Sequence, residues 1–287
     1  MDRYSALIVI PCFNEANRLC RESFVDYLKS SRLVRFLFVD DGSNDQTVER
    51  LHQIQRFFPQ RIEVHQLRQN GGKGEAVRQG MLIGTQTDAD WIGFWDADLA
   101  TPLSAIDCFI QRTTRSQRLD VVMGCRLPLM GHQVVRPWHR MVVSRVFAGF
   151  ASRVLGTRIR DTQCGAKLFR NTGLLESCLQ TPFTSPWIFD VELLARLAAV
   201  HAQLGQADWI SQSVYELPLD EWHEREGSKL KLKDFLAAPF ALAKLKWLYS
   251  GRRRFQFAKE ALSCHDNLPL PTLVPFTSTV EHERRAA

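Results

Sequence analysis

Short, continuous apolar runs alternate with amphipathic segments between residues 6 and 124. A continuous run bounded by polar residues is typical of a buried parallel strand, whereas apolar residues spaced three or four apart indicate a helix. The predicted strands cover 6–11, 34–39, 61–67, 91–95 and 120–124, with helices between them and a helix over 103–116. Strands that alternate with helices predict βαβ units with right-handed crossovers, and therefore an α/β fold.

The second half of the chain has a less regular pattern. Apolar residues at helical spacing follow Pro137, and further predicted elements are a strand over 166–170, an apolar helix over 189–202 and a strand over 213–217. A last helical stretch, 229–249, is interrupted by Pro239. We expect one domain over 1–228, an amphipathic helical segment over 229–254 and a polar, loosely held tail over 255–287.

Composition and charge restrict the possible partners. The 287 residues carry a net charge of +6, with a pI near 9.0, which favours a nucleotide, a phospholipid surface or a nucleic acid. The seven cysteines lack the paired spacing of a zinc site, so we expect reduced thiols. Met1 leads directly into the first strand and no apolar run approaches the ~20 residues that span a bilayer. We therefore expect a soluble or peripheral protein without a signal peptide.

Two acids, Asp96 and Asp98, follow the predicted strand over 91–95. Ligands bind at the carboxyl ends of the strands in open α/β sheets. If the chain stays extended there, side chains two residues apart point the same way and share one divalent cation. Oxygen ligands suit Mg²⁺ or Mn²⁺ on a diphosphate. An ordinary turn after a strand is the alternative explanation of this pattern.

Three other loops at strand ends carry polar groups. Residues 11–15 include Pro11, Asn14 and Glu15, and residues 39–43 include the adjacent acids Asp40 and Asp41. Adjacent carboxylates repel each other and need a cation or hydrogen-bond donors, which a base and a ribose supply.

The third loop, 68–74, is basic and rich in glycine, with Asn70 and Lys73 leading into a helix. Free N–H groups at a helix N-terminus favour an anion, and simple helix capping is the alternative. The loop lacks the spacing of a P-loop and does not follow the first strand as a dinucleotide fingerprint does.

Taken together, the four loops resemble, in order and spacing, the nucleotide-binding half of the inverting family 2 glycosyltransferases. The resemblance covers residues 6–249, and its nearest subgroup is the polyprenyl-phosphate glycosyltransferases. The segments 161–169 (DTQCGAKLF), 187–194 (WIFDVELL) and 227–230 (GSKL) look most like dolichyl-phosphate β-glucosyltransferases.

This resemblance implies a GT-A fold, a mixed but mostly parallel sheet flanked by helices, with a Rossmann-like nucleotide-binding half. Residues 1–228 would form its catalytic domain. By position, Pro11, Asn14, Glu15 and Asp41 would contact base and ribose with Asp40 close by, Asn70 and Lys73 would lie near the donor's diphosphate, and Asp96 and Asp98 would hold Mg²⁺ or Mn²⁺. Similar mannosyltransferases carry Gln after the acidic pair as a metal contact, whereas this chain has Ala100.

The resemblance also implies an acceptor site. Arg126, Arg140 and Ser144 would form a pocket for the acceptor phosphate, because guanidinium groups match phosphate oxygens. A solvated basic helix is the alternative explanation for Arg140 and Ser144, which lie four residues apart. A lipid phosphate is anionic at neutral pH and needs no base, whereas a hydroxyl acceptor would need Asp161, Asp190 or Glu192. Asp161 is the first candidate, with capping or pairing to Arg158 or Arg160 as its structural alternatives.

We therefore expect an inverting transferase that moves a hexose, with UDP-glucose as the favoured donor, to a polyprenyl phosphate. A hydroxyl of a glycan or glycolipid is an alternative acceptor, and a sugar-phosphate nucleotidyltransferase is an alternative enzyme. Basic residues are not gathered into a nucleic-acid platform, so we expect no nucleic-acid partner. Segments 143–154 and 235–254 have apolar faces with basic and aromatic borders, which favours peripheral contact with the cytosolic face of a membrane over ordinary core helices.

Overall fold

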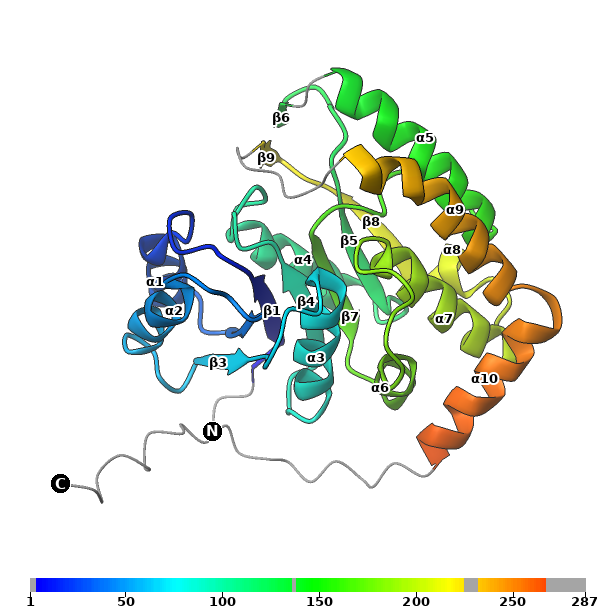
Figure 1. The fold of residues 1–287 in the computed structure, drawn as a ribbon, viewed down its shortest axis with the longest axis horizontal. Coiled ribbons are helices and arrows are strands. Elements are labelled where there is room, and N and C mark those ends of the chain that lie inside the picture. Colours follow the sequence, from blue (N-terminus) through cyan, green and yellow to red (C-terminus); the bar gives the residue numbers. More distant parts are fainter. Residues whose placement is uncertain (1–3, 136–137, 225–231, 267–287) are drawn as a thin grey trace.

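The computed structural model describes residues 4–135, 138–224 and 232–266, and its centre is a seven-stranded sheet (Figure 1). The strand order is β3-β2-β1-β4-β7-β5-β8, and β7 runs antiparallel to both of its neighbours while the other pairs are parallel. The strands are β1 (Ala6–Cys12), β2 (Val34–Asp40), β3 (Ile62–Gln66), β4 (Trp91–Trp95), β5 (Val121–Cys125), β7 (Ala166–Arg170) and β8 (Val214–Pro218). This confirms the α/β fold with a mixed, mostly parallel sheet.

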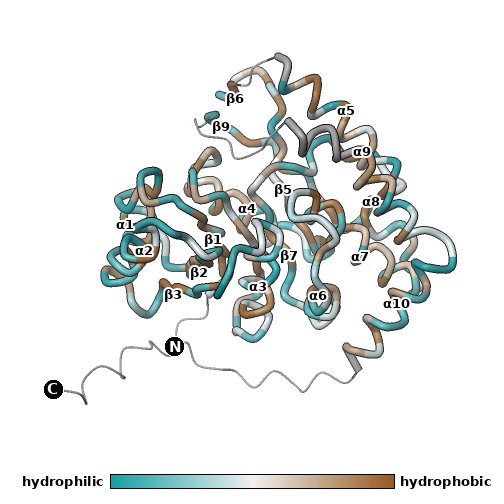
Figure 2. Tube along the Cα trace, viewed as in Figure 1, coloured by the Kyte–Doolittle hydropathy of each residue, from teal (hydrophilic) through white to brown (hydrophobic). Residues whose placement is uncertain are grey.

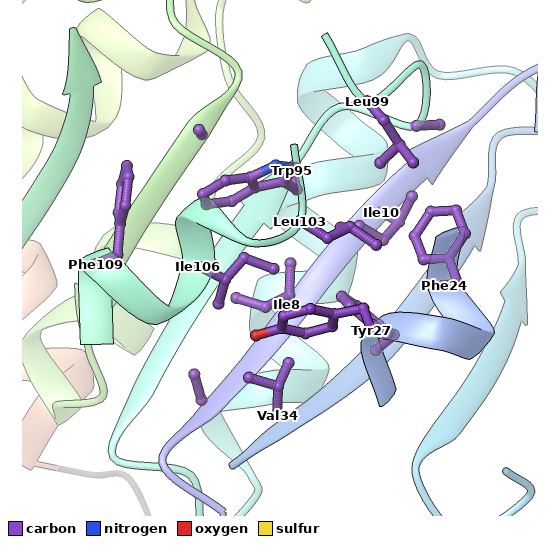
Figure 3. Close-up of a cluster of buried hydrophobic side chains, with 14 of the residues drawn as sticks. Ile8, Ile10, Phe24, Tyr27, Val34, Trp95, Leu99, Leu103, Ile106 and Phe109 are labelled. Carbon is purple, nitrogen blue, oxygen red and sulfur yellow. The ribbon is translucent and has the colours of Figure 1, made fainter. Parts of the chain in front are cut away.

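Helices cover both faces of the sheet, because successive residues of the strands point to opposite sides. In β1, Ile8 and Ile10 belong to one apolar cluster, whereas Leu7 and Val9 belong to the other. The first cluster, shown in Figure 3, includes Phe24, Tyr27, Trp95 and Phe109. The helices of that face are α1 (Arg21–Ser30), α2 (Thr47–Gln55) and α4 (Ala105–Arg115).

The opposite face carries α3 (Lys73–Thr85), α6 (Gly173–Leu179), α7 (Phe189–Gln203), α8 (Trp209–Ser213) and α10 (Gly251–Asp266). Gly80 in α3 allows a close approach to the sheet, since a β-carbon there would lie 2.4 Å from Val9 Cγ1. This packing brings the N-terminus of α3 to the carboxyl edge of β1 and β4 (Figure 1). The basic glycine-rich loop and the two acids therefore meet at one edge of the sheet.

Two long helices, α5 (Trp138–Leu155) and α9 (Leu232–Leu248), pack against each other outside the sheet layers. A third apolar cluster joins them to α7 through Ala151, Leu242 and Leu245. Figure 2 shows hydrophobic stretches along both helices. A short sheet of β6 (Gln133–Val135) and β9 (Glu221–His223) lies near the N-terminal start of α5, and the sequence did not predict it (Figure 1).

The predicted polar tail was wrong over residues 255–266. These residues belong to α10. Ala258 and Ala261 of this helix are buried in the apolar cluster on the face of the sheet that also carries α6 and α7. The remainder of the predicted tail, 267–287, lies outside the described residues, as do 225–231 at the predicted domain boundary. Within the described ranges, no helix combines the length and apolar character that crossing a bilayer requires.

Candidate functional site

A cavity of about 750 Å³ lies at the carboxyl edge of β1, β2 and β4 and at the start of β7 and α7. Most of the residues predicted for the site line it: Pro11, Asn14, Glu15, Asp41, Asn70, Lys73, Asp96, Asp98, Arg126 and Arg140. Asp40, Ser144 and Asp161 do not. The loops that were separate in the sequence therefore form one concave site.

Asp96 is held by its backbone and by a glycine. Its N–H donates to the carbonyl of Gly165 over 3.0 Å, and a β-carbon at residue 165 would lie 1.9 Å from Asp96 Oδ2. The other carboxylate oxygen, Oδ1, is 2.5 Å from the ammonium of Lys73. The position of Asp96 thus depends on the absence of a side chain at the start of β7.

Asp98 reaches the cavity through a turn, not through an extended strand as the sequence predicted. β4 ends at Trp95, the N–H of Leu99 donates to the carbonyl of Asp96, and Leu99 adopts a left-handed backbone with φ of 53°. Asp98 Oδ1 accepts from the N–H of Ala100 over 3.0 Å, and Oδ2 faces Arg18 Nη2 at 3.3 Å. Burial and then the charge of Asp96 raise the pKa of Asp98.

The two acids fit a divalent cation that is shared with an anionic ligand. They supply oxygen donors in one cavity, and the effect of Asp96 on the pKa of Asp98 marks a concentration of negative charge. Among the described residues, no group of three or more His, Cys, Asp or Glu side chains is arranged to hold a metal alone. A Mg²⁺ or Mn²⁺ here would take its remaining ligands from water and from phosphate oxygens.

Asp41 is the anion at the N-terminus of α3. Its carboxylate accepts from the N–H groups of Gly71 at 2.8 Å and Gly72 at 2.9 Å. Burial nevertheless raises the pKa of Asp41, against the opposite effect of these hydrogen bonds. The glycine-rich loop therefore uses two of its N–H groups to bind the chain's own carboxylate, and does not present them to a phosphate as the sequence suggested.

The loop after β1 is tied to the loop after β2. Asn14 has φ of 50°, its N–H donates to Ser43 Oγ over 2.9 Å, and its Oδ1 accepts from the N–H of Asn44 over 2.9 Å. The N–H of Glu15 donates to Thr47 Oγ1, and the buried Glu15 carboxylate faces Arg18 Nε at 3.4 Å. These contacts shape a polar wall that presents Asn14 and Glu15 to the cavity.

On the acceptor side of the predicted site, Arg126 forms a two-pronged ion pair with Asp161. Nε and Nη2 of Arg126 each lie 2.7 Å from an Asp161 oxygen, and the backbone N–H of Arg126 also donates to that carboxylate. Although burial acts in the opposite direction, the charge of Asp161 raises the pKa of Arg126. Asp161 does not line the cavity and both of its oxygens face Arg126, which favours a structural role over that of a base.

Arg140 lines the cavity and forms an ion pair with Glu224, whereas the hydroxyl of Ser144 donates to the carbonyl of Met141 in its own helix. The structure therefore brings Arg126 and Arg140, but not Ser144, to one cavity. Each arginine already has a carboxylate partner, so an acceptor phosphate would have to compete with Asp161 or Glu224.

Of the three acids considered as bases, Asp190 is the one that lines the cavity. It accepts from Gln163 Nε2 at 2.7 Å and faces Lys167 Nζ at 3.2 Å. Burial raises the pKa of Asp190, despite Lys167. Glu192 points elsewhere, because its carboxylate binds Arg196, Thr184 and Tyr249.

A comparison with family models matches residues 7–176 to the model described as glycosyl transferase family 2. The chain belongs to this family. It is a glycosyltransferase, and membership does not support the alternative of a nucleotidyltransferase.

Curated relatives of this family 2 chain include dolichyl-phosphate beta-glucosyltransferases. The one from Saccharomyces cerevisiae is 30% identical over 245 residues, which cover 78% of this chain and 69% of that protein. The one from Homo sapiens is 28% identical over 241 residues, which cover 78% and 68%. The subgroup expected from the segments 161–169 and 187–194 thus agrees with the relatives.

Solved structures confirm the GT-A fold of this family 2 enzyme. Glucosyl-3-phosphoglycerate synthase from Mycobacterium tuberculosis, in complex with Mn²⁺ and UDP-glucose, has a TM-score of 0.58 and 18% identity, with 85% of this chain and 78% of that chain covered. The same enzyme with Mg²⁺ and UDP has a TM-score of 0.58 and 19% identity, covering 85% and 78%. At this identity the likeness concerns the fold.

Several residues of this family 2 site were not singled out from the sequence. Arg18 bridges Glu15 and Asp98, Gly165 makes room for Asp96, and Trp222 lies under Arg126, 5.4 Å from its guanidinium carbon to the ring centre. Gly165 lies inside the segment 161–169 that carried the subgroup resemblance, so of the three it could most readily have been identified from the sequence. The sequence did not single out Arg18 or Trp222, because Arg18 meets Asp98 across 80 residues and Trp222 meets Arg126 across 96 residues.

Proposed function

We propose that this family 2 glycosyltransferase moves glucose from UDP-glucose to a polyprenyl phosphate, with inversion at the anomeric carbon. The observation that carries the proposal is the single cavity that holds Asp96, Asp98, Lys73, Arg126 and Arg140. The names of the dolichyl-phosphate beta-glucosyltransferase relatives support the sugar and the acceptor class.

The donor is assigned to the side of the cavity next to β1, β2 and β4. Asn14, Glu15 and Asp41 would bind the base and ribose, and Asp96 and Asp98 would hold Mg²⁺ or Mn²⁺ against the diphosphate. Such a cation, when bound, neutralises charge on the leaving diphosphate. Lys73 supplies a further positive charge on the same side, and Asn70 supports the loop by donating to the carbonyl of Asp41 over 3.1 Å.

The acceptor phosphate is assigned to the opposite side, near Arg126 and Arg140. A phosphate monoester has a second pKa of about 6, so it attacks as an anion without a base. The arginines would orient its oxygens, and Asp161 would keep the Arg126 guanidinium in place. Attack from the face opposite the diphosphate turns an α-linked donor into a β-linked product.

The contact with a membrane is assigned to a surface that we call the α5–α9 face: the exposed Val142, Val143, Val146 and Phe150 of α5 with Phe240 and Trp247 of α9. The exposed Arg145, Lys244 and Lys246 lie among these residues along the same helices, and Arg253 stacks on Trp247 at 3.4 Å. Apolar residues with basic neighbours suit an anionic bilayer surface, which favours the cytosolic leaflet. Because Arg140 at the start of α5 lines the cavity, a lipid lying along this face would present its phosphate there.

Product analysis tests the proposal. Incubation of the protein with radiolabelled UDP-glucose, Mn²⁺ and a polyprenyl phosphate should give a glycolipid that mild acid hydrolyses. Asp98→Asn should abolish its formation, and Arg140→Ala should raise the acceptor concentration required while donor binding stays nearly unchanged. Transfer at the wild-type rate by Asp98→Asn would contradict the metal assignment.

A hydroxyl acceptor is the second candidate, and the location of Asp190 favours it. A buried acid in the cavity with a raised pKa has the character of a general base. Transfer to a hydroxyl would slow as the pH falls through the raised pKa of Asp190, because the protonated acid cannot accept a proton. Asp190→Asn would reduce this transfer by about 10²-fold or more. A product whose glucose is not released by mild acid would favour this candidate over the lipid phosphate.

A further inference from the structure

The ammonium of Lys73 covers the donor-side oxygen of Asp96. Lys73 is the first residue of α3, and its Nζ lies 2.5 Å from Asp96 Oδ1, an atom that is itself buried. The lysine side chain retains 29% of its exposure and lines the cavity together with Asp98 and Asp190. A positive charge that belongs to the chain therefore already lies among the acids.

Of the two partners, Asp96 is fixed and Lys73 is the one able to move. The backbone of Asp96 is bonded to Gly165, and its Oδ2 packs against the same glycine without room for a β-carbon. Lys73 has a flexible four-carbon stem that faces a cavity of about 750 Å³. A change at this contact is therefore a movement of the lysine.

A divalent cation and this ammonium compete for Asp96. Mg²⁺ binds carboxylate oxygens at about 2.0–2.1 Å, so a cation on Oδ1 would lie within a few ångströms of an ammonium at its present place. A cation on Oδ2, the other oxygen of the same carboxylate, would still lie close to the Lys73 ammonium, and the two positive charges would repel each other. Binding of a metal to this carboxylate is therefore favoured when the lysine leaves Oδ1.

We propose that Lys73 is a resident cation that makes metal binding dependent on the donor, an inference that rests on the proposed donor site. In the free protein its ammonium neutralises Asp96 and excludes the metal. The diphosphate of a bound nucleotide offers oxygens to the ammonium, which releases Asp96 to the metal. The metal alone then binds weakly, nucleoside diphosphate strengthens its binding, and the metal strengthens nucleotide binding by the same factor.

The test measures Mn²⁺ binding to the full chain by the electron paramagnetic resonance of free Mn²⁺, with and without UDP. The variants are Lys73→Gln, which removes the charge, and Lys73→Arg, which keeps it. Lys259→Gln, an exposed lysine on α10, is the matched control. Thermal unfolding verifies that each variant is folded, and Asp96→Asn shows which binding belongs to this site.

Without UDP, Lys73→Gln should bind Mn²⁺ about 10-fold more tightly than the wild type, whereas Lys73→Arg and Lys259→Gln should not. With UDP, the wild type should gain Mn²⁺ affinity, and Lys73→Gln should lose most of that gain. A contrary outcome is that the wild type binds Mn²⁺ with UDP while Lys73→Gln binds Mn²⁺ without UDP no more tightly than the wild type does. In that case the inference fails and the donor site stands. If the wild type binds no Mn²⁺ even with UDP, the proposed donor site fails, and the inference with it.

Discussion

At the scale of single residues, the geometry of the acids depends on groups that carry no charge. Gly165 leaves space for the Asp96 carboxylate, and Leu99 accepts a left-handed backbone so that the chain turns and brings Asp98 to the cavity. A left-handed conformation costs a non-glycine residue of order 1–3 kcal/mol, which the surrounding contacts must offset. The site thus depends on the close approach of the Gly165 backbone to Asp96 and on the turn at Leu99, as well as on the two acids.

Gly165→Ala should reduce metal-dependent transfer by about 100-fold or more, because the new methyl group would occupy the place of Asp96 Oδ2. Steady-state rates at saturating donor, together with Mn²⁺ binding, measure this loss. Gly149→Ala is the control. Gly149 lies inside α5, and a β-carbon there would meet no atom closer than 3.8 Å. Equal activity of the two variants would mean that Asp96 tolerates displacement.

The cysteines should separate into two reactive classes. Burial raises the pKa of Cys164 to about 11 and that of Cys178 to about 12, so at neutral pH both remain thiols shielded from reagents. The exposed Cys20, Cys108 and Cys264 should react with iodoacetamide, because the reagent reaches their sulfur atoms. Mass spectrometry of the labelled peptides checks this, and labelling of Cys164 in the folded protein at neutral pH would contradict it.

At the scale of elements, α10 shows how a polar helix belongs to the core. Ala258 and Ala261 lie three residues apart on one side and are buried beside Phe257, while most other positions are charged or polar. Small residues let the helix approach α6 and α7 closely. Such a narrow apolar stripe is easily taken for a tail in the sequence, because alanine contributes little to an apolar pattern.

Ala258→Asp should destabilise the fold by about 3 kcal/mol or more, because it buries a carboxylate without a partner. Chemical denaturation followed by tryptophan fluorescence gives the change in the free energy of unfolding. The control is Gln256→Asp on the exposed side of α10, which should cost no more than a few tenths of a kcal/mol. A stability unchanged by Ala258→Asp would mean that α10 does not pack in solution as described.

At the scale of the whole molecule, the α5–α9 face and the cavity are joined by one helix. Arg140 lines the cavity, and Val142, Val143 and Val146 follow on the exposed part of α5. A long lipid on the proposed membrane face would therefore extend along α5 from the apolar residues to Arg140 at the cavity. Residues of the α5–α9 face can therefore be substituted, to test membrane binding, without changing residues of the donor site.

The double variant Val143→Asp and Val146→Asp should reduce binding to anionic phospholipid vesicles by about 10-fold or more, because it places two charges in the apolar face. Sedimentation of vesicles with bound protein measures it. Leu33→Asp, an exposed leucine between α1 and β2, is the matched control and should bind as the wild type does. Vesicle binding that survives the double variant would move the membrane contact to another surface.

Much of the fold could be predicted from the sequence, because buried strands and amphipathic helices have regular apolar spacing. The strand at 166–170 matches β7 at both ends, and the helix at 189–202 matches α7 to within one residue. The direction of β7 could not be predicted, since the two-residue period of a strand is the same in either orientation.

Most of the predicted residues that follow strands line one cavity, although Asp40 does not, and the contacts between distant residues could not be predicted. The Arg126–Asp161 pair joins positions 35 residues apart, and nothing local distinguishes these two residues from solvated charges. Asp41 was expected to face a ligand, but its carboxylate also supports the glycine-rich loop. The family resemblance placed the acids, whereas their hydrogen-bond partners came from the structure.

Activity depends on the register of the antiparallel strand β7, because Gly165 at its start must lie opposite Asp96. Because β7 is hydrogen-bonded on both sides, its neighbours jointly hold the one residue without a side chain opposite Asp96. A shift by a single position would bring Cys164 or Ala166 there, and either would carry a β-carbon into the carboxylate. A misaligned sheet could thus be compact and still inactive, so turnover reports on correct pairing at the centre of the sheet.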